Sequence, residues 1–120
     1  MKVFRFLEFR VYKDAKDFYN GIIKIASETP KRFDYLSLQL KRASLSVILN
    51  IAEGSAKNSD KDFNRYIQNS LGSINESLAC LEILLEHKLI TKDKFQKLFL
   101  EAEKIAKQLG GLSKKLKSEK

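Results

Sequence analysis

Residues 43–52 read ASLSVILNIA, ten consecutive residues without a charge in a chain that is 32% charged. They belong to a segment with helical periodicity that ends at Asn50-Ile51-Ala52-Glu53-Gly54. An ordinary surface helix buries one face and shows water a charged one. Because this segment has almost no charged face, we expect one side to pack into the chain's own core and the other to meet a second subunit. The stretch therefore predicts an oligomeric helical bundle.

Apolar residues recur at helical spacing through the rest of the chain, and no alternating strand pattern competes with them. The spacing predicts four helices, over about residues 5–27, 33–53, 60–88 and 92–110. Pro30 is expected to end the first helix, and Gly54 to close the second as a left-handed residue. Ser59 or Asp60 is expected to cap the third helix, and Thr91 the fourth.

Short connections between helices of this length place sequential neighbours antiparallel. The sequence thus predicts an all-α protein, an antiparallel up-down-up-down four-helix bundle formed by a single domain over residues 1–112. Gly110-Gly111 is expected to weaken the last helix, so that residues 113–120 form a basic flexible tail.

Polar residues form a narrow stripe on the second and third predicted helices. Its members are Gln39, Arg42, Ser46, Asn50 and Glu53 on the second helix, and Arg65, Asn69, Gly72 and Glu76 on the third. We expect Arg42 to pair with Glu76 and Glu53 with Arg65, and Gly72 to admit a second backbone. The favoured interpretation is that these groups satisfy one another and fix the register of a subunit interface, since they spread over some four turns. The alternative is that they line a binding site.

The formal net charge is +8 and the pI about 9.6. Residues 1–30 carry +2, residues 31–59 carry +3, residues 60–90 carry −2 and residues 91–120 carry +5. This concentration favours an acidic partner such as RNA or DNA, bound through phosphate contacts. The candidate residues are Lys104, Lys107, Lys114, Lys115 and Lys117, with Lys2, Arg5 and Arg10 adding to the same end. The alternative is a basic tail that only confers solubility.

Little in the sequence points to catalysis. The chain has one histidine, His87, and one cysteine, Cys80, without metal-ligand spacing or a glycine-rich phosphate loop. We expect no enzyme activity, no metal and no cofactor. The aromatic residues sit at core spacing, and Tyr35 is the least constrained of them. A lone cysteine, with no signal peptide or membrane-spanning stretch, favours the reducing cytoplasm.

The segment from Gln39 to Gly54 resembles the signature of the small four-helix-bundle proteins found in bacterial 23S ribosomal RNA intervening sequences, roughly Q-x-R-R-A-x-x-S-I-x-x-N-I-A-E-G. Leu71-Gly72-Ser73-Ile74-Asn75-Glu76 is similar to the family's G-S-x-x-E on the third helix. Tyr12 stands where the family commonly has Trp, and Thr29 where it usually has Phe. The similarity covers about residues 5–112.

The resemblance implies a ring-like homopentamer. It also implies a likeness to the accessory variability determinant of diversity-generating retroelements, a basic pentamer that binds nucleic acid and works with a reverse transcriptase. The sequence therefore predicts a non-enzymatic homo-oligomeric accessory protein that binds RNA or DNA through a basic surface, with a reverse transcriptase or another protein as a further partner. The alternative is a protein-interaction scaffold whose charge only confers solubility.

Overall fold

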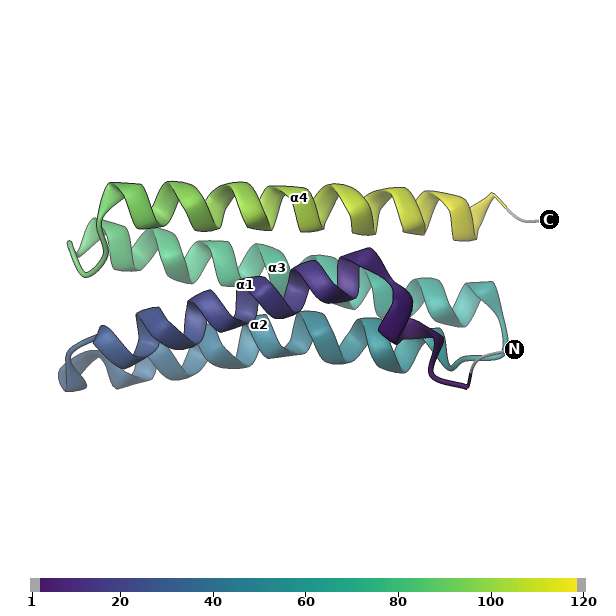
Figure 1. Ribbon diagram of the computed structural model, residues 1–120, viewed down its shortest axis with the longest axis horizontal. Coiled ribbons are helices and arrows are strands. Elements are labelled where there is room, and N and C mark those ends of the chain that lie inside the picture. The colour runs from purple at the N-terminus through teal and green to yellow at the C-terminus, as the bar shows by residue number, and fades with distance from the viewer. Residues whose placement is uncertain (1–2, 119–120) are drawn as a thin grey trace.

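The structure, a computed structural model, describes residues 3–118 and consists mainly of four long helices (Figure 1). Their bounds are Arg10–Glu28 for α1, Asp34–Ser55 for α2, Asp60–Glu86 for α3 and Lys92–Lys117 for α4. Two short 3₁₀ turns, η1 (Arg5–Glu8) and η2 (Lys31–Phe33), precede α1 and α2. The described part of the chain contains no strand, which confirms the all-α class.

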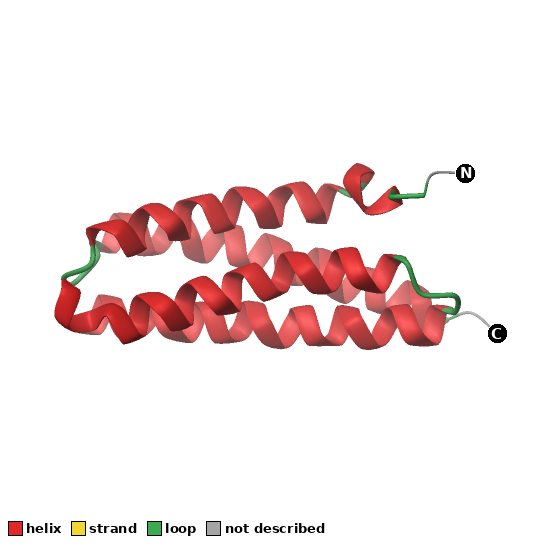
Figure 2. Ribbon diagram, turned by 90° about the horizontal axis from the view of Figure 1, so that it is seen from below, coloured by secondary structure: helices red, strands yellow, loops and turns green. Residues whose placement is uncertain are grey.

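The helices lie side by side, and each runs opposite to the one before it (Figures 1 and 2). Polar contacts between α1 and α4 show the direction. Lys94, near the start of α4, pairs with Glu28 at the end of α1 at 3.2 Å. Gln108, farther along α4, donates to Asp14 near the start of α1 at 2.8 Å. The arrangement is the predicted up-down-up-down bundle, 48 × 23 × 20 Å in extent.

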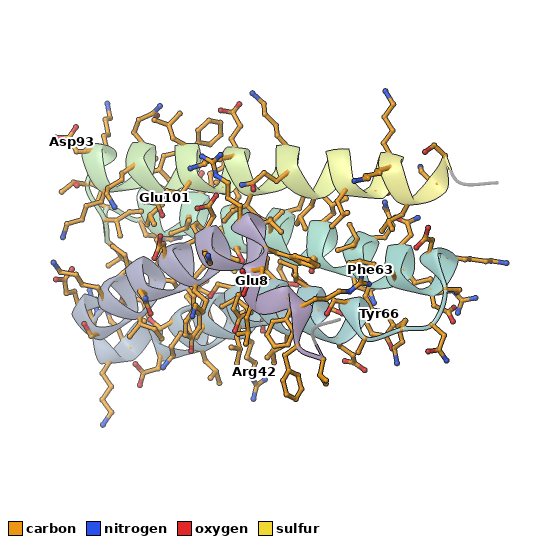
Figure 3. The ribbon with its side chains drawn as sticks, turned by 45° about the vertical axis from the view of Figure 1, so that its right-hand side comes forward. Glu8, Arg42, Phe63, Tyr66, Asp93 and Glu101 are labelled. Atoms are coloured by element: carbon orange, nitrogen blue, oxygen red, sulfur yellow. The ribbon has the colours of Figure 1, made fainter. Side chains whose placement is uncertain are left out.

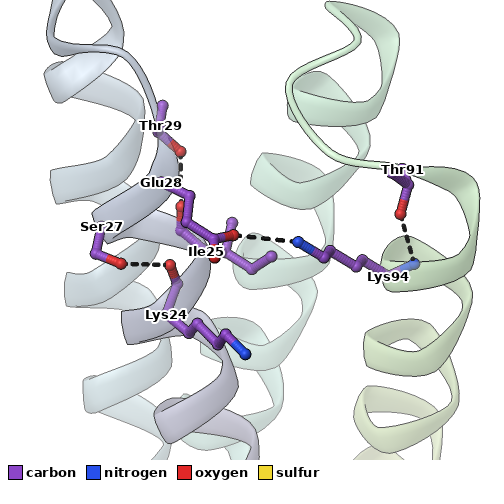
Figure 4. A network of polar contacts seen from close by, with 7 residues as sticks. All are labelled: Lys24, Ile25, Ser27, Glu28, Thr29, Thr91 and Lys94. Carbon is purple, nitrogen blue, oxygen red and sulfur yellow. Dashed lines mark hydrogen bonds and ion pairs between the residues drawn. The ribbon is translucent and has the colours of Figure 1, made fainter.

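Polar side chains fix the helix ends where the chain turns (Figure 4). The Thr29 hydroxyl donates to the Ile25 carbonyl at 2.9 Å as α1 ends. At the start of α4 the Thr91 hydroxyl accepts the Lys94 backbone N–H at 3.1 Å, and Ser59 caps α3 in the same way. Caps of this kind contribute about 1 kcal/mol each because they satisfy N–H groups that the helix leaves unpaired.

One apolar core runs the length of the bundle, and all four helices contribute to it. Its fully enclosed large side chains are Phe18, Ile22, Leu40, Val47, Ile51, Ile67, Leu81, Leu84, Ile105 and Leu109. Within each helix these positions recur at helical spacing, as an inward-facing apolar stripe requires.

Serines let α2 and α3 pack closely, and these two helices share the most extensive contact in the bundle. The buried Ser70 hydroxyl donates to the Val47 carbonyl on α2 at 2.8 Å. The Ser73 hydroxyl bonds that of Ser46 at 2.9 Å, again from α3 to α2. Small side chains bring the helices together, and their hydroxyls find partners across the seam.

The prediction that Gly54 closes the second helix as a left-handed residue is wrong. It has a helical, negative φ and lies inside α2, which continues to Ser55. The glycine is required by packing. A Cβ at this position would lie 2.6 Å from the Cβ of Tyr66 and 3.0 Å from the ring of Phe63. The first turns of α3 therefore approach the α2 backbone where no side chain fits.

Gly54→Ala is expected to destabilise the fold by about 1–3 kcal/mol, because the added methyl group must displace α3. Gly111→Ala is the matched control. An added Cβ there meets nothing within 4 Å, and alanine raises helix stability by about 0.5–1 kcal/mol. Urea unfolding of both variants measures the two opposite shifts. Equal stability of both variants would contradict the packing role of Gly54.

Two helix boundaries also differ from prediction. The first helix starts at Arg10, after a 3₁₀ turn that folds the segment toward α2. The last helix continues through Gly110-Gly111 to Lys117, so residues 113–117 are helical, not a tail. Apolar packing outweighs the low helix propensity of the two glycines, because Leu109 and Ser113 are buried and Leu112 and Leu116 pack against the core.

Candidate functional site

The polar stripe predicted on α2 and α3 does not converge on one point. Its inner members hold the two helices in register. Asn50 donates to the carbonyl and hydroxyl of Ser46, whose hydroxyl in turn meets Ser73 on α3. Gln39 donates a hydrogen bond to the Glu76 carboxylate across the same seam. These contacts join α2 and α3 within one chain.

The two ion pairs expected in the stripe are absent from the described residues. Glu76 accepts from Gln39 and not from Arg42, which is exposed and extends outward from the bundle (Figure 3). Glu53 and Arg65 are also exposed and do not pair with each other. All three side chains are exposed, so they lie on the outer side of the seam; helical spacing places residues on one face of a helix but does not fix which residue of the next helix they meet.

The outward side of α2 forms a first candidate surface, called here the α2 outer face. Its members are spaced three or four residues apart: Tyr35, Leu38, Arg42, Leu45 and Leu49. All five are exposed, and four of them are large apolar side chains. A contiguous apolar stripe on the outside of a soluble bundle is typical of an interaction surface. The uncharged stretch 43–52 contributes Leu45 and Leu49 to it.

The neighbouring side of α3 is mostly polar. Exposed residues follow a heptad-like spacing at Arg65, Asn69, Gly72, Glu76 and Ala79. A Cβ at Gly72 meets nothing within 4 Å, so the described chain itself places nothing against this glycine. The expected close approach of a second backbone therefore has no counterpart within the single chain.

A second candidate surface is one end of the bundle, called here the basic end. It comprises residues 3–10, 53–66 and 107–118, which Figure 1 shows at the same end of the bundle. Its nine basic residues are Arg5, Arg10, Lys57, Lys61, Arg65, Lys107, Lys114, Lys115 and Lys117. Its four acidic residues are Glu8, Glu53, Asp60 and Asp62. The basic end therefore carries a net charge of +5. The opposite end of the bundle, residues 24–34 and 82–97, carries +2.

The structure gathers four of the five candidate lysines at the basic end. Lys114, Lys115 and Lys117 are exposed in the last turns of α4, where their charge also complements the helix dipole. Lys107 lies nearer the middle, in an open hollow that Arg10 also lines. Lys104 lies outside the basic end, beside the Asp14 carboxylate at 3.6 Å.

Arg5 and Arg10 join this end, as predicted, whereas Lys2 and Lys120 lie outside the described residues. Three basic residues of this end were not among the predicted nucleic-acid-binding residues: Lys57, Lys61 and Arg65, of which Arg65 was predicted only as a member of the polar stripe. Lys61 and Lys117 line one hollow of about 510 Å³ although 56 positions separate them in the chain. Only the antiparallel arrangement of α3 and α4 brings them together.

Two cations of the basic end lie over aromatic rings. The Arg5 guanidinium lies over the Phe63 ring at 5.2 Å, and the Lys57 ammonium lies over the Tyr66 ring at 5.0 Å. Phe63 and Tyr66 are on the first turns of α3 (Figure 3). Arg5 also donates from Nε to the Ser55 carbonyl at 3.0 Å, which ties η1 to the end of α2. Arg5 is therefore partly structural.

Reactive groups do not gather anywhere among residues 3–118. Burial, and to a lesser degree the Glu76 charge, raises the pKa of the Cys80 thiol, which keeps it protonated and unreactive. His87 is exposed beyond α3, with its ring 6.0 Å from that of Phe33. No group of three His, Cys, Asp or Glu residues in this range is placed to hold a metal ion. Nor does this range contain a helix with enough apolar length to cross a lipid bilayer.

Three comparisons with known proteins concern the family and the fold of this chain. The family model of the 23S rRNA-intervening sequence protein matches residues 7–111. A crystal structure from Bacteroides thetaiotaomicron, a protein with unknown function from the S23 ribosomal protein family, superposes with a TM-score of 0.82. The sequences are 24% identical, and the alignment covers 87% of this chain and 98% of that chain. This similarity supports the fold. The search of curated proteins found no match.

Proposed function

The chain belongs to the 23S rRNA-intervening sequence protein family, and from this premise we propose that it is a non-enzymatic, homo-oligomeric accessory protein that binds nucleic acid through its basic end. The observation that carries the proposal is the charge asymmetry of the bundle. Nine basic residues against four acidic ones at a single end form a positive surface suited to phosphates. The cytoplasm is the compartment that best suits this role.

Oligomer formation is the second part of the proposal. The α2 outer face supplies an apolar surface without a cover, and Gly72 beside it leaves room for a close backbone approach. Five subunits is the number that the family resemblance implies. Each added copy would bring another basic end, so the assembly would hold a phosphate backbone at several points at once.

Replacing Lys114, Lys115 and Lys117 together with Gln tests the nucleic-acid part. We expect about tenfold weaker binding to a generic RNA hairpin at about 0.1 M salt, because three phosphate contacts are lost. The slope of the logarithm of the association constant against the logarithm of salt concentration should become shallower by about 2 or more. Fluorescence anisotropy across a salt series measures both quantities.

The matched control removes three exposed lysines from the opposite end by changing Lys31, Lys88 and Lys92 to Gln. It lowers the net charge equally, so an effect of total charge would appear in both variants. Only the first variant should lose affinity. No binding of the original protein at low salt, or a flat salt response, would contradict the proposal.

The protein-interaction scaffold is the second candidate, and the apolar α2 outer face is the observation that favours it. In that case a protein partner, for example a reverse transcriptase, would occupy part of this face. The triple lysine variant distinguishes the candidates in a pull-down with such a partner. A scaffold keeps its partner when the three charges are removed.

A further inference from the structure

We propose that the basic end is built to hold single-stranded nucleic acid in preference to a duplex, with the Phe4 ring as a stacking surface for a base. This inference rests on the proposed function and makes its ligand more specific. It begins from a side chain that the core does not explain. Phe4 is 64% exposed, whereas Phe18 and Phe63 are buried.

The Phe4 ring makes limited contact with the protein. Its ring centre is 6.4 Å from that of Phe6, with the planes at 75°, an edge-to-face arrangement. Phe6 in turn meets Tyr12 at 4.9 Å and 72°. Phe4 is therefore the outermost member of a row of three rings, supported from one side by Phe6 while most of its surface stays open to water.

The segment that carries Phe4 is tied to the bundle by the residues that follow it. Arg5 bonds the Ser55 carbonyl and lies over Phe63, and the Phe9 ring stacks on Phe63 at 6.4 Å and 15°. The Leu7 backbone N–H donates to the Phe4 carbonyl at 3.2 Å, which closes the 3₁₀ turn. Phe4 is thus presented at a defined place on the basic end.

An exposed flat ring on a surface with a net positive charge suits a single strand. Bases in an unpaired strand can turn out and stack on an aromatic side chain while lysines hold the phosphates, whereas the bases of a duplex are already stacked on each other. An anionic membrane is the competing partner, because Val3 and Leu7 are also exposed near Phe4. Those aliphatic side chains cannot stack with a base, so their truncation distinguishes the two partners.

The test uses the full chain with Phe4→Ala, Phe4→Trp and Leu7→Ala variants. The ligands are a 20-nucleotide oligouridylate and a 20-base-pair RNA duplex, measured at about 0.1 M salt, and phosphatidylserine vesicles are tested in parallel. Phe4→Ala is expected to weaken single-strand binding at least fivefold, about the loss of one stacked base, and duplex binding less than twofold. Leu7→Ala should bind both RNAs like the original protein.

Phe4→Trp provides a direct signal because the chain contains no tryptophan. Its single-strand affinity should equal or exceed that of the original protein, and the oligouridylate should quench its fluorescence. Unchanged single-strand affinity in Phe4→Ala, with no quenching in Phe4→Trp, would overturn the stacking role while leaving the lysine-dependent function intact. Vesicle binding that Phe4→Ala and Leu7→Ala both abolish, with RNA binding unaffected, would overturn it in favour of a membrane. Failure of the original protein to bind either RNA at low salt would overturn the proposed function itself.

Discussion

Leu49→Arg is expected to convert the assembly into single subunits of 13.8 kDa. Leu49 lies on the α2 outer face with 53% of its surface exposed, so arginine is tolerated there in the isolated bundle. In a subunit interface the same arginine would be buried without a partner, at a cost of about 3–5 kcal/mol per contact. Light scattering on gel-filtered protein at micromolar concentration measures the mass directly.

Leu100→Arg is a closely matched control for this experiment. Leu100 is on α4 and is also 53% exposed. The Leu100→Arg variant should keep the mass of the original assembly, and this result would exclude a general effect of added charge. Ser46→Arg would be a poorer probe than Leu49→Arg, because Ser46 bonds Ser73 within the α2–α3 seam and its loss would damage the subunit itself. A mass of 13.8 kDa for the original protein would contradict the oligomer proposal outright.

Helix periodicity and end signals made most of the fold predictable. The inward positions of α1, namely Val11, Ala15, Phe18, Ile22 and Ile25, are those that the apolar spacing indicated. Ser59 and Thr91 cap the helices that follow them, as short polar side chains before a helical run predict. Such features depend on residues within a turn of one another, which the sequence displays directly.

Features that depend on contacts between helices were harder to predict from the sequence. Gly54 was assigned a left-handed φ because glycine after a helical run usually has one, whereas Tyr66 and Phe63 are what exclude a side chain there. Gly110-Gly111 was expected to end α4, whereas the packing of its last turns extends the helix. Local propensity gives way to tertiary packing in both cases.

The residues of the candidate site also divide into those that local sequence predicts and those that only the packing of the helices brings together. Charge counting along the chain found the C-terminal lysines and missed Lys57, Lys61 and Arg65 as members of the same surface; Lys61 and Arg65 lie in residues 60–90, which carry a net negative charge. Their position beside α4 follows from the bundle topology. Outward-facing charges also cannot be paired reliably from helical spacing, because the 100° step allows neighbouring residues to point to opposite sides of a seam. The absent pairs of Arg42 and Glu53 follow from this.

Phe63→Ala is expected to lower the free energy of unfolding by about 3–5 kcal/mol and the midpoint of thermal unfolding by about 10–20 °C. The Phe63 ring is 4% exposed and contacts the Gly54 region of α2, the Phe9 ring and the Arg5 guanidinium. Its removal opens a cavity where η1, α2 and α3 meet. Differential scanning calorimetry measures the change in the intact chain.

Phe63→Leu separates packing from the placement of the N-terminal segment. Leucine keeps much of the apolar volume, so its cost should stay near 1–1.5 kcal/mol. It removes the ring that Arg5 and Phe9 contact, and with it the cation–π and stacking contributions. If those contacts position Phe4, Phe63→Leu should weaken oligouridylate binding nearly as much as Phe4→Ala does, despite a stable fold. Full single-strand affinity in Phe63→Leu, alongside a loss in Phe4→Ala, would mean that the Ser55 carbonyl contact of Arg5 is enough to present the ring.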